Sequence, residues 1–115
     1  MGQIWAYSTR SGQLSLVYES PGPETLDFPD NVTTQGRALV LCEDNVNDNY
    51  LRALNSGGRL SSIALNRLVG RTGPRFNDEF AGATFSPGGE TLYVNIQAAA
   101  GMSFAIWGPW QRLGI

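Results

Sequence analysis

The densest group of potential metal ligands in the sequence lies in the polar segment 43–49. This segment begins with Glu43 and Asp44 and continues with three asparagines and a further aspartate. Carboxylate and amide oxygens are the ligands that hard cations such as Ca²⁺ take. The segment lacks the glycine and the terminal glutamate that an EF-hand loop carries at fixed positions. The pattern leaves two interpretations open, a metal site around Glu43 and Asp44 or a polar surface turn.

Three further polar residues are candidates for the same kind of site, and each also has a purely structural interpretation. Glu79 lies shortly before an apolar segment, either as a metal ligand or as a solvated loop carboxylate beside Asp78. Asp30 and Asn31 follow Pro29 at the start of a short strand. They either bind calcium, if the strand lines the central channel of a ring-shaped fold, or cap a turn. The candidate metal ligands are therefore Glu43, Asp44, Glu79, Asp30 and Asn31.

The residue types that the chain lacks exclude several classes of catalytic site. The chain has no histidine and no lysine, so it builds neither a Ser-His-Asp triad nor a Schiff base from its own residues. Its single cysteine, Cys42, allows no internal disulfide and no cysteine zinc finger. Cys42 precedes Glu43 in an apolar run, and strand alternation predicts that the two side chains point to opposite faces, with the thiol buried and inert.

Composition favours an all-β protein. Charged residues make up 16% of the 115 residues, and glycine, which suits tight turns, occurs 14 times. The net charge is −2 and all eight basic residues are arginines scattered along the chain, so no basic surface for nucleic acid is expected. No apolar run reaches the ~20 residues that span a bilayer. The N-terminus lacks the charged and apolar regions of an export signal.

Periodicity divides the chain into short strands separated by turn residues. The predicted strands cover residues 4–9, 14–19, 31–34, 38–42, 50–54, 60–65, 83–86, 91–97 and 102–107. A helix is the main alternative for residues 50–65, but the Ser-Gly-Gly at 56–58 interrupts it after about one turn, which favours strand, turn and strand.

An internal repeat indicates how these strands are organised. The segment from Asn31 to Leu41 resembles the segment from Thr84 to Val94, and the two are 53 residues apart. Similar spacings are typical of four-stranded propeller blades. We therefore expect a partial β-propeller of about two to three four-stranded antiparallel blades. Residues 4–20 are the outer strands of one blade, 28–66 a full blade, and 79–108 the inner strands of a further blade.

A propeller needs about four to eight blades to close its ring. The expected partners are accordingly the missing propeller blades or further copies of the chain, and without them the sheet edges are exposed.

Several consecutive motifs resemble the C-terminal part of the PhoX-type alkaline phosphatases, a bacterial family. The motifs cover residues 26–31, 39–44, 49–52, 77–82, 85–97 and 105–110. The resemblance implies a propeller with a phosphatase site that holds calcium and iron, in proteins exported to the periplasm or secreted. It supports Glu43 and Glu79 as metal ligands, with Asp44, Asp30 and Asn31 in support, while the catalytic and substrate-binding residues stay unknown.

The expected function is that of a fragment of a metal-dependent hydrolase of phosphate monoesters, which is not active alone. Two alternatives stay open: a propeller module that binds or scaffolds without catalysis, and a truncated protein without function.

Overall fold

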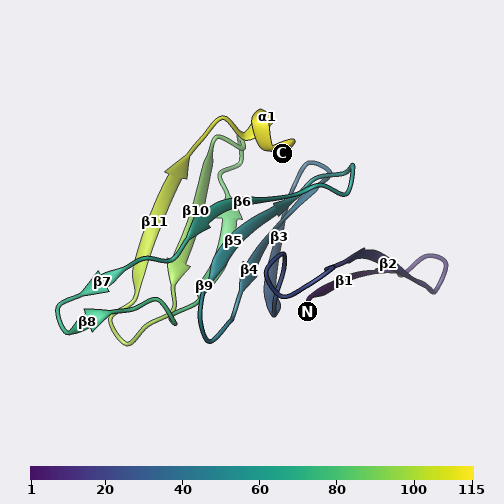
Figure 1. Ribbon diagram of the computed structural model, residues 1–115. Coiled ribbons are helices and arrows are strands. Elements are labelled where there is room, and N and C mark those ends of the chain that lie inside the picture. Colours follow the sequence, from purple (N-terminus) through teal and green to yellow (C-terminus); the bar gives the residue numbers. More distant parts are fainter.

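The alternating and apolar runs of the sequence form antiparallel sheets throughout a computed structural model that describes residues 1–115 (Figure 1). The prediction of an all-β fold is confirmed. The elements in chain order are β1 (Gln3–Ser8), β2 (Gln13–Glu19), β3 (Pro29–Gln35), β4 (Ala38–Glu43), β5 (Tyr50–Leu54), β6 (Leu60–Leu65), β7 (Val69–Gly70), β8 (Gly73–Pro74), β9 (Phe80–Phe85), β10 (Thr91–Ile96), β11 (Met102–Trp107) and α1 (Trp110–Leu113).

The central sheet has the strand order β3-β4-β5-β6, so each strand pairs with its neighbour in sequence. Its two inner strands, β4 and β5, are almost wholly buried, as the apolar run predicts. The turn between β5 and β6 contains Gly58 with φ +80°, a backbone conformation that favours glycine. The predicted strand, turn and strand over residues 50–65 is therefore confirmed, and the helical alternative is wrong.

A second sheet, with the order β11-β10-β9, packs against one face of the central sheet. Val40, Cys42 and Leu51 of the central sheet form a continuous apolar core with Leu92 and Val94 of β10. Each of these side chains is almost fully buried, and burial of a residue of this size stabilises the fold by about 1.5–3 kcal/mol. This core fixes β9 beside β3 and β4, which share contacts with it.

The short helix α1 closes one end of this core. Trp110 is buried, its indole Nε1–H donates to the Glu90 carbonyl at 2.8 Å, and its ring meets Phe85 edge-on at a centroid distance of 5.5 Å. α1 spans four residues and is the one helix of the chain, and no helix here is long or apolar enough to cross a bilayer.

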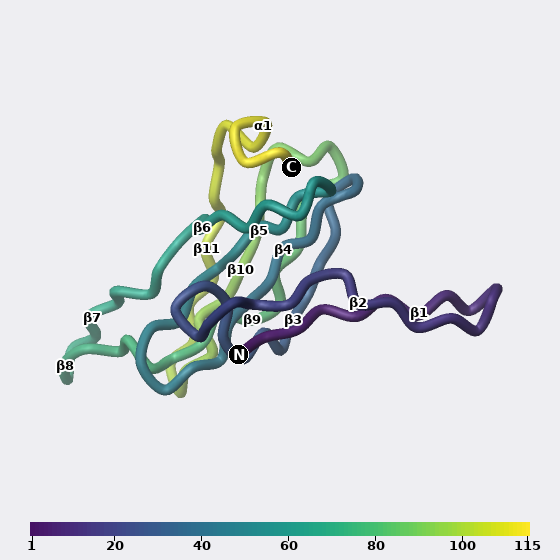
Figure 2. The backbone as a smooth tube through the Cα atoms, turned by 45° about the vertical axis from the view of Figure 1, so that its right-hand side comes forward, coloured from purple at the N-terminus to yellow at the C-terminus, as the bar shows by residue number.

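The β1–β2 hairpin lies on the other face of the central sheet. Ile4 and Tyr18 at its base pack against Leu26, Leu41 and Leu54, while the tip projects away from the rest of the chain (Figure 2). The short β7–β8 ribbon, which the sequence predicts only as a loop, projects at another end (Figure 1). The hairpin, the central sheet and the second sheet fall within 3–19, 29–65 and 80–107. Their assignment to blades of a propeller stays a prediction.

Candidate metal centre

Three carboxylates from different parts of the chain meet at one edge of the two packed sheets. Asp30 lies on β3, Asp44 follows β4, and Glu79 precedes β9, and one oxygen atom from each lies within 4.8 Å of the others. Asp30 and Asp44 are exposed, whereas Glu79 is half-buried. We call this group the acidic cluster.

The pairing of β3 with β4 explains how two of these residues come together. Pro29 pairs with Glu43 and Asn31 pairs with Cys42, so Asp30 is an extra residue in a β-bulge. Bulges change the direction of a side chain and are frequent beside functional sites. The Asp44 amide donates to the Phe28 carbonyl at 3.0 Å, which holds the segment after β4 against the start of β3.

The backbone next to the bulge is strained. Phe28 has φ +41° and is the one residue other than glycine with a positive φ in the chain. For a bulky side chain this conformation costs about 1–3 kcal/mol. The rest of the fold therefore keeps Phe28 in an unfavourable conformation at the point where its carbonyl binds Asp44.

Glu79 reaches the cluster because β9 lies beside β3. Its backbone carbonyl accepts a hydrogen bond from Gln97 at 2.9 Å, which fixes the residue at the end of the second sheet. The Oε2 atom of Glu79 is buried and has no hydrogen-bond partner. Desolvation raises the pKa of Glu79 above its usual value, and the charges of Asp30 and Asp44 raise this pKa further.

The acidic cluster contains no compensating positive charge. The four ion pairs of the chain involve Asp27, Glu43, Asp48 and Asp78, and none involves a member of the cluster. Three uncompensated carboxylates repel one another, and a cation between them would remove that repulsion. The donor set consists only of oxygen atoms, which suits Ca²⁺ and similar hard cations.

Glu43 lies on the opposite face of the central sheet and outside the cluster. Its carboxylate is almost fully buried and accepts hydrogen bonds from the Asp27 amide, the Tyr50 amide and Arg52 Nε, each at 3.1 Å. Burial raises the pKa of Glu43, while the amide of Asp27 and the guanidinium of Arg52 act against this increase. In this arrangement Glu43 holds the segment before β3 and the strand β5 together.

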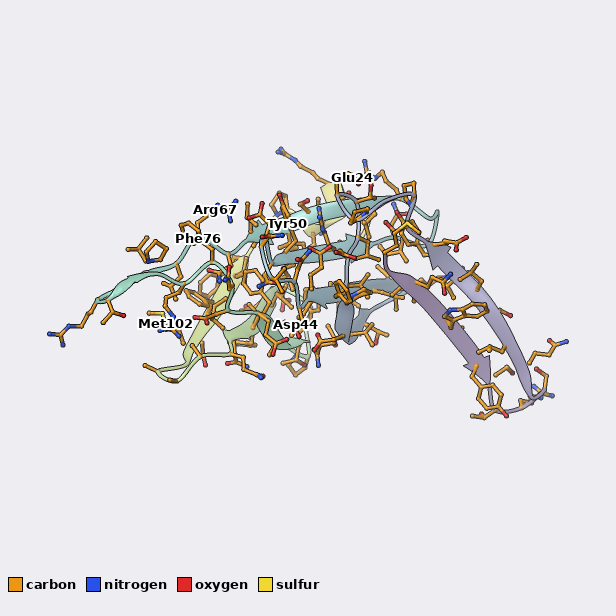
Figure 3. The ribbon with its side chains drawn as sticks, turned by 60° about the horizontal axis from the view of Figure 1, so that its bottom comes forward. Glu24, Asp44, Tyr50, Arg67, Phe76 and Met102 are labelled. Carbon is orange, nitrogen blue, oxygen red and sulfur yellow. The ribbon has the colours of Figure 1, made fainter.

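Arg52 completes a polar network around Glu43. Its guanidinium donates to Ser62 Oγ at 2.6 Å and stacks 3.7 Å from the centroid of the Tyr50 ring. The network borders a polar cavity of about 320 Å³, whose lining includes Glu24 and Tyr50. Figure 3 shows Glu24 and Tyr50 in the upper part of the view and Asp44 below them, in agreement with the separation of the two sites.

Asn31 and Cys42 lie beneath the cluster, in the sheet. Asn31 Oδ1 is 3.9 Å from Cys42 Sγ, at the limit of a weak hydrogen bond. Cys42 is fully buried, and desolvation raises the pKa of its thiol to about 11, against the effect of a hydrogen bond with the Ala83 backbone. The charges of Asp30 and Glu79 also raise this pKa. The structure therefore brings together Asp30, Asp44 and Glu79, and it places Glu43 on the opposite face of the central sheet.

Almost the whole chain, and not only this site, matches a known protein family. The family model of the alkaline phosphatase PhoX matches residues 2–100, which include every member of the acidic cluster. No curated protein and no solved structure matches the chain. A match over this share of the sequence shows that the chain belongs to the PhoX family of alkaline phosphatases.

Proposed function

We propose that this chain supplies part of the metal centre of a hydrolase of phosphate monoesters, with Asp30, Asp44 and Glu79 as ligands of a divalent cation. The observation that carries this proposal is the meeting of three unpaired carboxylates, one of which has a buried oxygen without a partner. Membership of the PhoX family supplies the class of reaction.

Ca²⁺ fits this group of residues better than iron does. The cluster offers carboxylate oxygens and no imidazole, and the only thiol of the chain is buried in the core. When bound, such a cation polarises a phosphoryl oxygen and stabilises the charge that develops on the transferred group. The three carboxylates themselves hold the ion and leave the mouth of the site open, since Asp30 and Asp44 are exposed.

The chain alone is expected to bind metal weakly and not to turn over substrate. Ca²⁺ takes about 6–8 oxygen ligands, and three side chains provide that number only with water or with groups from a partner. Proteins of the PhoX family are typically periplasmic or extracellular, and we include this location of the chain in the same proposal.

Calorimetric titration with Ca²⁺ tests the ligand assignment. Asp30→Asn, Asp44→Asn and Glu79→Gln should each weaken binding by about tenfold or more, since a loss of 1.4 kcal/mol corresponds to that factor. Glu90→Gln, which removes an exposed carboxylate outside the cluster, is the matched control and should bind as the unaltered chain does. Equal affinity in all four variants would refute the assignment.

A second titration separates a hydrolase from a non-catalytic binding module. The module is the second candidate because the β1–β2 hairpin exposes the apolar side chains of Trp5, Tyr7, Leu14 and Leu16. Inorganic phosphate should bind to the chain in the presence of Ca²⁺ and not in EDTA if the ion is placed to meet a phosphoryl oxygen. Binding of Ca²⁺ without any affinity for phosphate supports the binding module instead.

A further inference from the structure

Two loops carry two of the three members of the acidic cluster. Asp44 begins the connection from β4 to β5, and Glu79 ends the connection from β8 to β9. Both connections lie at the lower end of the sheets in Figure 1. Loops are usually the more mobile parts of a fold, whereas the ligands of one cation have to keep a fixed separation. The two loops therefore need a brace if both carboxylates are to meet one ion.

Asn66 holds the peptide group that precedes Glu79. Its side chain is buried, and its Nδ2 donates to the carbonyl groups of Asp78 and Arg75, each at 2.7 Å. Its Oδ1 accepts a hydrogen bond from the Leu68 amide at 2.9 Å. Because both N–H groups of the side-chain amide are used in this way, Asn66 fixes the backbone on the N-terminal side of Glu79.

Asn49 holds the peptide group that follows Asp44. Its Oδ1 accepts a hydrogen bond from the Asn45 amide, which belongs to that peptide group. Its Nδ2 donates to the Phe76 carbonyl at 3.4 Å, in the loop that carries Glu79. Asn49 is fully buried, so a single side chain in the interior contacts both loops.

A backbone hydrogen bond joins the two asparagines. The Asn66 amide donates to the Asn49 carbonyl at 2.9 Å. An unbroken series of hydrogen bonds thus runs from the peptide group after Asp44 to the peptide group before Glu79. The loops cannot separate without leaving buried amides unsatisfied, which is costly. The series therefore opposes the mutual repulsion that would drive the two carboxylates apart.

We propose that Asn49 and Asn66 are positioning residues of the metal centre, which hold Asp44 and Glu79 at the separation that one divalent cation requires. This inference rests on the proposed function of the acidic cluster. Both asparagines act through the backbone beside the ligands. Replacement of residues that orient metal ligands typically costs about 10–100-fold in metal affinity.

Calorimetric titration with Ca²⁺ tests the proposal on variants that are folded by circular dichroism. Asn66→Ala and Asn49→Ala should each weaken binding by at least about tenfold. If Asn66→Ala does not fold, Asn49→Ala serves alone, because it removes fewer hydrogen bonds. Asn55→Ala is the matched control, since Asn55 Oδ1 accepts hydrogen bonds from the amides of Gly57 and Arg59 at the other end of β5. This control should bind Ca²⁺ as the unaltered chain does.

Double substitutions separate positioning from general support of the fold. Asn66→Ala combined with Glu79→Gln should weaken binding by clearly less than the product of the two single effects, because the charged ligand that Asn66 positions is already lost. Asn49→Ala combined with Asp44→Asn should behave in the same way. If both pairs instead give the full product of their single effects, the asparagines support the fold alone and the proposal is overturned.

Tb³⁺, which resembles Ca²⁺ in size and in its preference for oxygen ligands, gives a spectroscopic readout at saturation. Its luminescence decay in H₂O and D₂O counts the waters bound to the ion. Asn66→Ala and Asn49→Ala should each bind Tb³⁺ with about one more water than the unaltered chain, since water fills the position that a displaced carboxylate leaves. An unchanged count in both would contradict the proposal.

The ligand variants distinguish failure of this inference from failure of the proposed function. If Asp44→Asn and Glu79→Gln weaken Ca²⁺ binding while Asn49→Ala and Asn66→Ala do not, the positioning role is wrong and the metal centre stands. If none of the four substitutions weakens binding, the metal centre itself is wrong and the positioning role fails with it.

Discussion

Replacement of Glu79 by Gln should stabilise the chain when no cation is present. The side chain keeps its shape but loses the charge that faces Asp30 and Asp44 within 4.8 Å. Two unit charges at that distance repel by about 0.9 kcal/mol in water and by about 3.5 kcal/mol at an effective dielectric constant of about 20. Because Asp30 and Asp44 are exposed, the lower value applies, and the two lost pairs together amount to about 2 kcal/mol.

The pH dependence of this effect has a definite sign. The pKa of Glu79 is higher in the folded chain than in the unfolded chain. The ionised form is thus disfavoured by folding, and the stability of the unaltered chain falls as pH rises from the unfolded pKa through the folded one. The advantage of Glu79→Gln should therefore be absent near pH 4 and largest near pH 8.

Thermal denaturation followed by circular dichroism measures this difference. In EDTA at pH 8 the melting temperature of Glu79→Gln should exceed that of the unaltered chain by about 8 °C, since about 2 kcal/mol is divided by an unfolding entropy of roughly 0.24 kcal/mol/K for a chain of this length. Added Ca²⁺ should narrow the difference, since a ligand at 100 times the dissociation constant of the unaltered chain stabilises that chain by about 2.7 kcal/mol and a variant of tenfold weaker affinity by about 1.4 kcal/mol. Glu90→Gln should show neither effect. A lower melting temperature for Glu79→Gln in EDTA, or a difference that pH and Ca²⁺ leave unchanged, would refute the reasoning.

Three other substitutions or probes examine the scaffold. Arg52→Met should cost about 3–5 kcal/mol in urea denaturation because it leaves the buried Glu43 carboxylate without its cation, and Glu43→Gln should cost less. Cys42 should not react with a thiol reagent at pH 8 until the chain unfolds, since the thiol is buried and its pKa is about 11; rapid labelling of the folded chain would contradict the burial. Gly58→Ala should cost about 1–2 kcal/mol because of its φ of +80°, while Gly57→Ala, whose φ is not positive, should cost less in the same denaturation assay.

The sheets could be predicted from the sequence because alternation and turn glycines are local signals. The interruption at Gly57 and Gly58 correctly favours two strands over a helix, and the apolar run before Glu43 correctly indicates an inner strand. The β7–β8 ribbon escapes prediction because each of its strands has two residues, too few to show a period.

The acidic cluster could be predicted only in part. Asp30, Asp44 and Glu79 each stand next to a strand end, which is a local property, but their meeting depends on β9 lying beside β3. Strand alternation correctly separates Cys42 from Glu43. It does not say which of the two faces also receives Asp30 and Glu79, because that depends on the packing of the second sheet.

The bulge at Asp30 also escapes prediction, since a single extra residue leaves no mark on the pattern of a short polar strand. The exposure of the apolar side chains on the β1–β2 hairpin escapes prediction in the same way. The alternation of Leu14 and Leu16 predicts one apolar side but gives no sign that this side stays uncovered.

The extra residue on β3 makes the proposed ligand Asp30 separable from the sheet that carries it. Pro29 and Asn31 already pair with consecutive residues of β4, so loss of the single codon for Asp30 would restore regular pairing without shifting either flank of the strand. If Asp30 is a metal ligand as proposed, deletion of one codon would remove it while the sheet stays intact, and one insertion at the same place would restore it.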